Sequence, residues 1–142
     1  MTARVLYLFH SMVSPNGSIP SCPSSSVNDV LIVEDEHSAR RALSLLLCSC
    51  GFRPQTFRTA EEAVVWLEGG EHPKIALVDL DLPGIDGIEF IEKLAQFSPA
   101  TRSVLVSATD EETLARRTHG HSVPFLRKPI NFDALLGLLN AQ

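Results

Sequence analysis

The sequence predicts an α/β protein built on a doubly wound parallel sheet of five strands. Five short apolar runs of strand length recur along the chain, and each is followed by helical spacing or by a helix-capping signal. The clearest runs are apolar throughout, as in strands that are covered on both faces. Strands that alternate with helices imply parallel pairing with helices on both faces, and right-handed crossovers leave few topologies.

The five expected strands are not equally well marked. Val30–Val33 is an unbroken aliphatic run rich in β-branched residues, and Ile75–Val78 is a second apolar run, so both favour buried strands. Pro124 shortens the last run, because proline cannot donate to a hydrogen-bond ladder. The expected strands cover residues 30–33, 52–57, 75–78, 104–106 and 123–127.

Each expected helix is marked by its spacing, its cap or its stop. Apolar residues recur at helical spacing from Ala39 to Cys50, and Gly51 then ends the first helix. Thr59–Glu62 form a capping box that opens the second helix, which Gly69-Gly70 closes. The last three helices have expected caps at Asp86, Thr109 and Asn131, and end near Phe97, His119 and Asn140.

The first 27 residues lack this pattern. Residues 11–26 are rich in serine and proline, so we expect residues 1–27 to form a disordered extension. The apolar run from Val5 to Phe9 is too short for a signal peptide, or for the roughly 20 residues that span a bilayer. We therefore expect one folded domain over residues 28–142 and no membrane contact.

Composition argues against several classes of function. The 142 residues carry a net charge of −5, so direct nucleic-acid binding is not expected. The three cysteines form no regular framework, which argues against a disulfide-stapled secreted domain. A cytoplasmic protein is the expectation.

Polar residues fall at the carboxyl ends of four expected strands. Glu34-Asp35 follow the first, Asp79 the third, Ser107 the fourth and Lys128 the fifth. Each of these residues alone is more often a turn, cap or solvated surface residue. Because the carboxyl ends of parallel strands meet at one edge of a sheet, together they predict one pocket with three carboxylates, a hydroxyl and an ammonium. Carboxylates gathered in this way favour a cation, and Mg²⁺ takes such oxygen ligands.

The motifs around these residues resemble the receiver domain of bacterial two-component response regulators. The matching segments are Val33-Glu34-Asp35, Val78 to Gly87, Val106-Ser107-Ala108 and Phe125 to Pro129. The resemblance covers the chain from about Asn28 to its end and implies a flavodoxin-like fold with strand order 2-1-3-4-5. Residues 116–122 depart from the Gly-Ala-containing loop of many family members, which bears on the length of the helix before them.

This resemblance implies a phosphoacceptor pocket. Asp79 would take a phosphoryl group from the phosphohistidine of a partner histidine kinase. Asp35 and Asp79 would hold Mg²⁺ (or Mn²⁺), with the backbone carbonyl of Asp81 as a further ligand and Glu34 acting through a water.

The resemblance also implies a switch that catalyses only its own phosphorylation and dephosphorylation. Lys128 would pair with the phosphoryl group, Ser107 would hydrogen-bond it, and Phe125 would turn inward to fill the space left. The face made by the fourth helix, fifth strand and fifth helix would then present a different surface to a downstream protein target. A phosphorylation-dependent dimer is a further partner that the resemblance allows.

Two alternatives stay open at this point. The chain could relay its phosphoryl group to a histidine phosphotransfer protein. Val78-Asp79-Leu80-Asp81 also resembles the Asp-x-Asp motif of haloacid-dehalogenase-like phosphatases. In those enzymes the nucleophile ends the first core strand and the extra acids follow the lysine, whereas here Glu34-Asp35 precede Asp79. The phosphatase is therefore the remote alternative.

Overall fold

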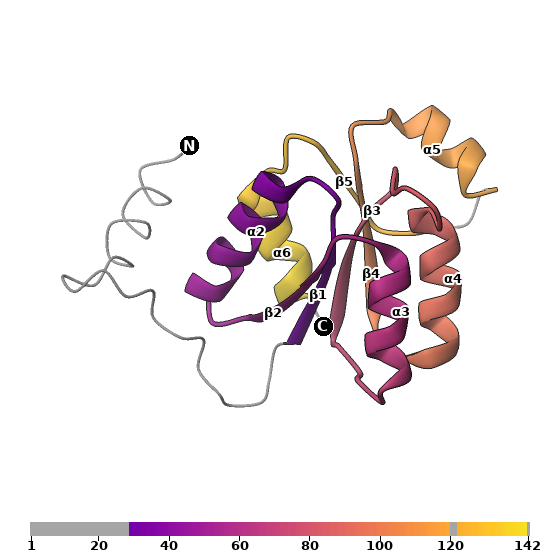
Figure 1. The fold of residues 1–142 in the computed structure, drawn as a ribbon. Helices are drawn as coiled ribbons and strands as arrows, with labels where there is room; N and C mark the ends of the chain where they lie inside the picture. Colours follow the sequence, from indigo (N-terminus) through magenta and orange to yellow (C-terminus); the bar gives the residue numbers. More distant parts are fainter. Residues whose placement is uncertain (1–28, 120–121, 142) are drawn as a thin grey trace.

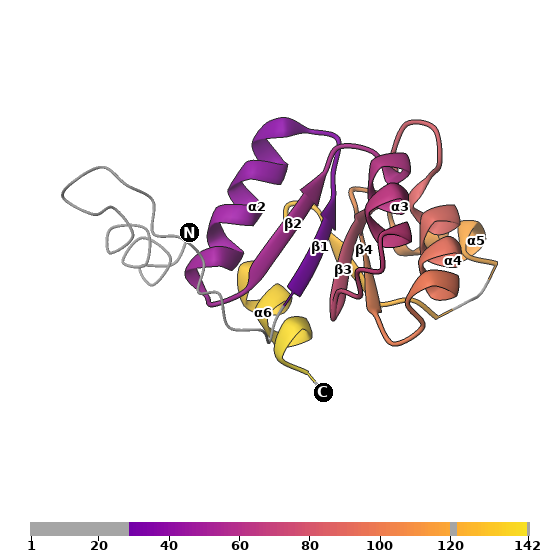
Figure 2. The same cartoon turned by 60° about the horizontal axis from the view of Figure 1, so that its bottom comes forward.

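A parallel sheet of five strands in the order β2-β1-β3-β4-β5 forms the centre of the fold (Figures 1 and 2). The structure, a computed structural model, describes residues 29–119 and 122–141. The strand order and the parallel pairing confirm the expected architecture, while the extension expected over residues 1–27 lies outside the described residues. The strands are β1 (Asp29–Val33), β2 (Arg53–Phe57), β3 (Ile75–Asp79), β4 (Arg102–Ser107) and β5 (Phe125–Arg127).

Helices cover both faces of this sheet. In Figures 1 and 2, α2 and α6 lie on one face, and α3 and α4 lie on the other. Within the described ranges, no helix is both long and apolar enough to cross a membrane. The helices are α2 (His37–Ser49), α3 (Ala60–Glu68), α4 (Gly87–Phe97), α5 (Glu111–Arg117) and α6 (Phe132–Asn140).

The strand residues alternate between two core layers. Ile32 and Leu77 pack in the layer that includes Leu47 of α2. Leu31 and Val78 point to the opposite face and pack in the layer of α3 and α4. This alternation follows from the two-residue period of a strand. All five residues of β3 are buried, which explains why that strand reads as a continuous apolar run.

Three of the expected helix caps are confirmed, because each side chain accepts a hydrogen bond from the backbone N–H three residues further on. These caps are Thr59, Asp86 and Asn131. The return hydrogen bond of the expected capping box has a different donor. The carboxylate of Glu62 accepts from the N–H of Arg58 at 3.3 Å, in place of the N–H of Thr59. Sequence signals therefore located the starts of α3, α4 and α6 correctly.

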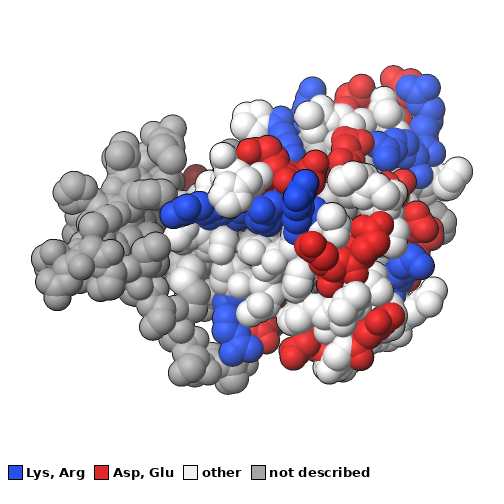
Figure 3. All heavy atoms as spheres, in the orientation of Figure 1, with Lys and Arg blue, Asp and Glu red and all other residues white. Residues whose placement is uncertain are grey.

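Helix α5 differs from the expectation at both ends. The expected cap at Thr109 is wrong: Asp110 caps the helix, because its carboxylate accepts from the N–H of Thr113 at 2.8 Å. The N–H of Thr109 donates instead to Oγ of Ser107 at 3.0 Å. The helix ends at Arg117 and does not run to His119, whose φ of 52° is left-handed. The resulting helix has seven residues. Its acidic side chains lie in the first turn and its basic side chains in the last turn, at the upper right of Figure 3.

Strand β5 is shorter than the expected range of 123–127. The carbonyl of Pro124 accepts from the N–H of Leu105 at 2.9 Å, but proline has no N–H, so the ladder continues only from Phe125. Proline also stands in the other edge strand, where Pro54 of β2 pairs with Val30. Proline therefore removes one backbone donor from β2 and limits the length of β5.

The connection between β3 and α4 is tightly packed against the end of β3. Gly84 adopts a φ of +74°, which favours glycine. A Cβ on Gly87 would lie against the carbonyl oxygen of Asp79 and 2.8 Å from the Cα of Leu80. Because both atoms belong to the backbone, they cannot move aside as a flexible side chain would. Glycine at position 87 lets α4 begin directly beside Asp79.

We expect Gly87→Ala to lower the free energy of unfolding by about 1–3 kcal/mol, the usual cost of overpacking. The matched control is Gly137→Ala in α6, where an added Cβ meets no atom within 4 Å. That control should raise the free energy of unfolding by up to about 1 kcal/mol, because alanine favours a helix. Urea unfolding followed by circular dichroism measures both, and a loss of similar size in the two variants would contradict the packing argument.

Candidate functional site

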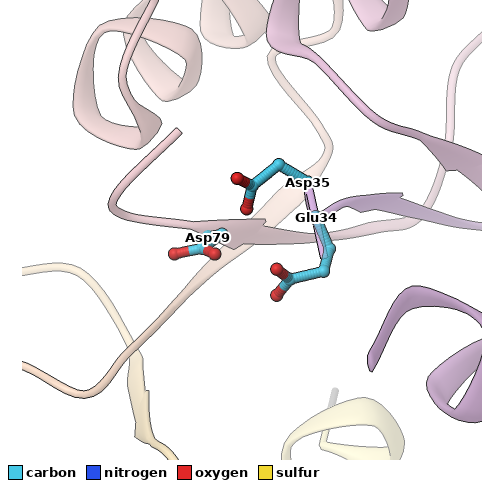
Figure 4. A group of neighbouring side chains, drawn as sticks. All are labelled: Glu34, Asp35 and Asp79. Carbon is cyan, nitrogen blue, oxygen red and sulfur yellow. The ribbon is translucent and has the colours of Figure 1, made fainter. Parts of the chain in front are cut away.

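The carboxyl ends of β1 and β3 bring three carboxylates together. Glu34 and Asp35 directly follow β1, Asp79 ends β3, and the oxygen atoms they offer lie within 4.8 Å of one another. Figure 4 shows the three side chains converging from these two strand ends. Glu34 and Asp79 are each only 6% exposed, whereas Asp35 is open to solvent. The structure thus places these three residues as the sequence predicts.

Lys128 reaches the same pocket from the end of β5. Its Nζ donates to Oε2 of Glu34 at 3.0 Å and to Oδ2 of Asp79 at 3.1 Å. The lysine side chain is 30% exposed, so its ammonium is partly shielded from water. The ammonium of Lys128 therefore bridges the buried carboxylates of Glu34 and Asp79.

Burial and hydrogen bonding act in opposite directions on the pKa values of Glu34 and Lys128. Loss of water raises the pKa of Glu34, the hydrogen bond from Lys128 lowers it in part, and the charge of Asp79 raises it again, so the net pKa is raised. Burial alone would lower the pKa of Lys128, but its hydrogen bonds to the two carboxylates outweigh that effect. The pKa of Lys128 therefore lies above its ordinary value, and the side chain is charged at neutral pH.

The charge and the donor atoms of the pocket fit a divalent cation. Three carboxylates against one ammonium leave two negative charges, and two of the carboxylates are buried. Such an excess is costly unless a cation offsets it. The side chains offer oxygen ligands, which Mg²⁺ prefers, and the exposed Asp35 leaves room for waters on the ion.

Arg40 of α2 holds the backbone of the turn formed by Glu34 and Asp35, which we call the acidic turn. This residue was not identified from the sequence. Its Nη1 donates to the backbone carbonyls of Glu34 at 2.8 Å and Asp35 at 3.3 Å. Glu36 supports the same turn by capping α2, because its carboxylate accepts from two backbone N–H groups. Arg40 and Arg41 both lie about one turn into the helix that follows the acid pair, so position in the sequence does not single out Arg40.

Ser107 lies at the end of β4 and is hydrogen-bonded to Asp81. Its Oγ donates to Oδ2 of Asp81 at 3.3 Å and accepts from the N–H of Thr109 at 3.0 Å. The N–H of Asp81 in turn donates to Oδ1 of Asp79 at 3.0 Å. Phe125 is half-buried and packs against the small apolar cluster beneath α5. The switching roles of Ser107 and Phe125, and the carbonyl ligand role of Asp81, stay predictions.

Known proteins share both this fold and this sequence pattern. Residues 30–140 match the family model described as the response regulator receiver domain. A cyclic di-GMP phosphodiesterase of Thermotoga maritima is 34% identical over 107 residues, which cover 75% of this chain and 28% of that protein. The KDP operon transcriptional regulatory protein KdpE of Escherichia coli is 34% identical over 110 residues, covering 77% of this chain and 48% of that protein. A response regulator receiver protein from Pseudomonas putida has a crystal structure that superposes with a TM-score of 0.72 at 29% identity, covering 83% of this chain and 99% of that one.

The chain belongs to the response regulator receiver family, whose members act in two-component signalling and interact with histidine kinases. Its acidic trio of Glu34, Asp35 and Asp79 is typical of receivers that bind Mg²⁺. The chain spans about a quarter to about a half of the length of the curated relatives that it matches. The activities of those longer proteins are therefore not assigned to it.

We expect Lys128→Met to lower the free energy of unfolding by about 1–2 kcal/mol in metal-free buffer, because it leaves two buried carboxylates without their cation. This magnitude is below that of a fully buried pair, since Lys128 is partly exposed. Because the folded state raises the pKa of Lys128, the stability that the ammonium adds is present below its unfolded-state pKa and disappears as the pH rises through the folded-state pKa.

Denaturant unfolding at pH 7 and at strongly alkaline pH measures this difference. The exposed Lys74, which directly precedes β3 at the far end of the sheet, provides the matched control Lys74→Met. An equal loss in the two variants, or a loss for Lys128→Met that does not shrink at alkaline pH, would contradict the role given to the ammonium.

Proposed function

We propose that this chain is a phosphorylation switch that accepts a phosphoryl group from a histidine kinase onto Asp79. The observation that carries the proposal is the environment of the Asp79 carboxylate. One oxygen accepts from the ammonium of Lys128 and the other from the N–H of Asp81, while Glu34 and Asp35 lie beside it. A carboxylate oriented in this way is a suitable nucleophile for forming an aspartyl-phosphate.

Transfer of the phosphoryl group from the kinase phosphohistidine to Asp79 needs no further reactant. An oxygen of Asp79 attacks the phosphorus of the kinase phosphohistidine, and a new O–P bond forms as the N–P bond breaks. The electron pair of the broken bond returns to the imidazole nitrogen. Lys128, already 3.1 Å from Asp79, is positioned to pair with the negative oxygens that arrive with the phosphoryl group.

The acidic trio supplies the expected metal ligands. Asp35 and Asp79 would hold Mg²⁺ directly, the carbonyl of Asp81 would complete the protein ligands, and Glu34 would act through a water. Bound there, Mg²⁺ would supply positive charge that offsets the charge on the transferring oxygens. Arg40 keeps the backbone of the acidic turn in place for this arrangement.

The surface beside the pocket is suited to a protein partner. An open, mainly apolar groove of about 370 Å³ runs between α2 and α6, with Lys128 and Glu34 at its edge. A protein that carries a phosphohistidine could contact this groove while it presents the phosphoryl group to Asp79. After transfer, Ser107 would turn toward the phosphoryl group and Phe125 would follow, which changes the surface near α5 and β5 that a downstream protein would recognise.

The family match favours this function over the phosphatase alternative, because the receiver pattern includes the acid pair that precedes Asp79. Relay of the phosphoryl group to a histidine phosphotransfer protein uses the same first step. No feature of the described residues favours relay over direct signalling, so the acceptor step is the function that we propose.

We expect acetyl phosphate with Mg²⁺ to add one phosphoryl group to the wild-type chain, as measured by intact mass. Asp79→Asn should abolish the addition, because an amide is no nucleophile for phosphorus. The control Asp133→Asn removes an exposed carboxylate in the first turn of α6 and should leave labelling unchanged. Labelling that survives Asp79→Asn would refute the acceptor assignment, and steady release of phosphate from small phosphoesters would favour the phosphatase.

We also expect Mg²⁺ to raise the free energy of unfolding by about 1.4 kcal/mol at a concentration ten times its dissociation constant. Asp35→Asn should weaken binding and reduce this increase at the same concentration, because it removes a charged ligand. Asp133→Asn serves again as the control and should behave as the wild type. Urea titrations with and without Mg²⁺ measure the effect, and an unchanged response in Asp35→Asn would remove Asp35 from the metal site.

A further inference from the structure

Arg117 ties α5 to the connection that follows β3. Its Nη1 lies 2.8 Å from Oδ1 of Asp81, and its Nη2 lies 4.0 Å from Oδ2 of Asp86. Helix α5 otherwise buries only Leu114 among its seven residues. The ion pairs of Arg117 therefore add to the packing of Leu114 in holding this short helix next to the acidic pocket.

The same carboxylate that Arg117 holds also holds Ser107. Oδ2 of Asp81 accepts from the Ser107 hydroxyl at 3.3 Å, and Oδ1 accepts from Arg117. A serine hydroxyl carries one hydrogen, so it donates to one acceptor at a time. Ser107 is only 1% exposed, so few acceptors other than Asp81 are within its reach. The hydroxyl must leave Asp81 before it can donate to a phosphoryl oxygen on Asp79.

We propose that Arg117 is a latch for the switch: it holds the Asp81 carboxylate where that carboxylate competes with the phosphoryl group for the Ser107 hydroxyl. This inference rests on the proposed function. It names a residue that sets the balance between two states of the Ser107 hydroxyl, one donating to Asp81 and the other donating to the phosphoryl group. Arg117 acts through Asp81 and is a positioning residue. Arrival of the phosphoryl group draws Ser107 away from Asp81, which removes one of the two contacts that keep that carboxylate facing α5.

The solvent exposure of the Arg117–Asp81 ion pair determines how far loss of Arg117 shifts the equilibrium of the Ser107 hydroxyl. The side chain of Arg117 is 33% exposed and that of Asp81 is 58% exposed, so water and ions screen their attraction. Without Arg117, the Asp81 side chain is free to turn into solvent and release Ser107. Exposed ion pairs of this kind correspond to a shift of about two- to fivefold in an equilibrium.

A titration with beryllofluoride in the presence of Mg²⁺ tests the latch, since this anion mimics a phosphoryl group on an aspartate. Arg117→Ala should bind beryllofluoride about two- to fivefold more tightly than the wild type. The matched control is Arg116→Ala, because the side chain of Arg116 is more exposed and, within the described part of the chain, forms an ion pair only with Glu112. That control should bind as the wild type does. Unchanged or weaker binding by Arg117→Ala overturns the latch.

A double-mutant cycle tests the route through Asp81. Asp81→Ala removes the competing acceptor and should itself tighten beryllofluoride binding. Adding Arg117→Ala to Asp81→Ala should then change nothing further. If the arginine substitution has its full effect in both backgrounds, Arg117 acts by its charge alone and the latch is refuted.

The amide of Thr109 gives a second readout that needs neither Mg²⁺ nor a phosphoryl group. Its N–H donates to Oγ of Ser107, so its NMR shift reports the position of that hydroxyl. The shift should change in Arg117→Ala and stay unchanged in Arg116→Ala; an unmoved Thr109 signal in Arg117→Ala overturns the latch. If the wild type neither binds beryllofluoride nor takes up a phosphoryl group, the proposed function fails first, whereas wild-type binding with no effect of Arg117→Ala defeats only the latch.

Discussion

The geometry of a parallel sheet brings like charges together in this protein, and the rest of the site supplies the positive charge that offsets them. Strands that run in one direction end at one edge, so Asp79 meets the adjacent pair Glu34 and Asp35 there although it is distant from them in the sequence. Burial of two of these carboxylates would be unfavourable without positive charge. Lys128 supplies one charge from the end of β5, and the two negative charges that remain match a divalent ion.

The sequence predicted the fold and the carboxylates of the site because both depend on abrupt changes from apolar to charged residues at the ends of single strands. Val30–Val33 and Ile75–Val78 pass directly from apolar residues to carboxylates, which marks the strand and its functional end together. Caps at Asp86 and Asn131 were equally local signals. The cap of α5 lies one residue beyond the expected one, because Thr109 and Asp110 are both good caps and the sequence alone does not choose between adjacent candidates.

The contacts around the site were beyond sequence reasoning, because they depend on how helices dock. Arg40 reaches the carbonyls of the acidic turn only because α2 folds back along β1 and β2. Arg117 meets Asp81 only because α5 ends next to the β3–α4 connection. Charged side chains on a helix usually face water, so spacing alone gave no reason to single out either arginine.

The prolines in the outer strands bear on how copies of this protein can meet. An open sheet exposes backbone groups along its edges, and those groups can template pairing with a neighbouring chain. Pro54 interrupts the row of donors on β2, and Pro124 limits β5 to three residues. Neither margin is a good template for a sixth strand, so growth of the sheet from one molecule into the next is disfavoured. Self-association of this receiver is thereby directed to its helical surfaces.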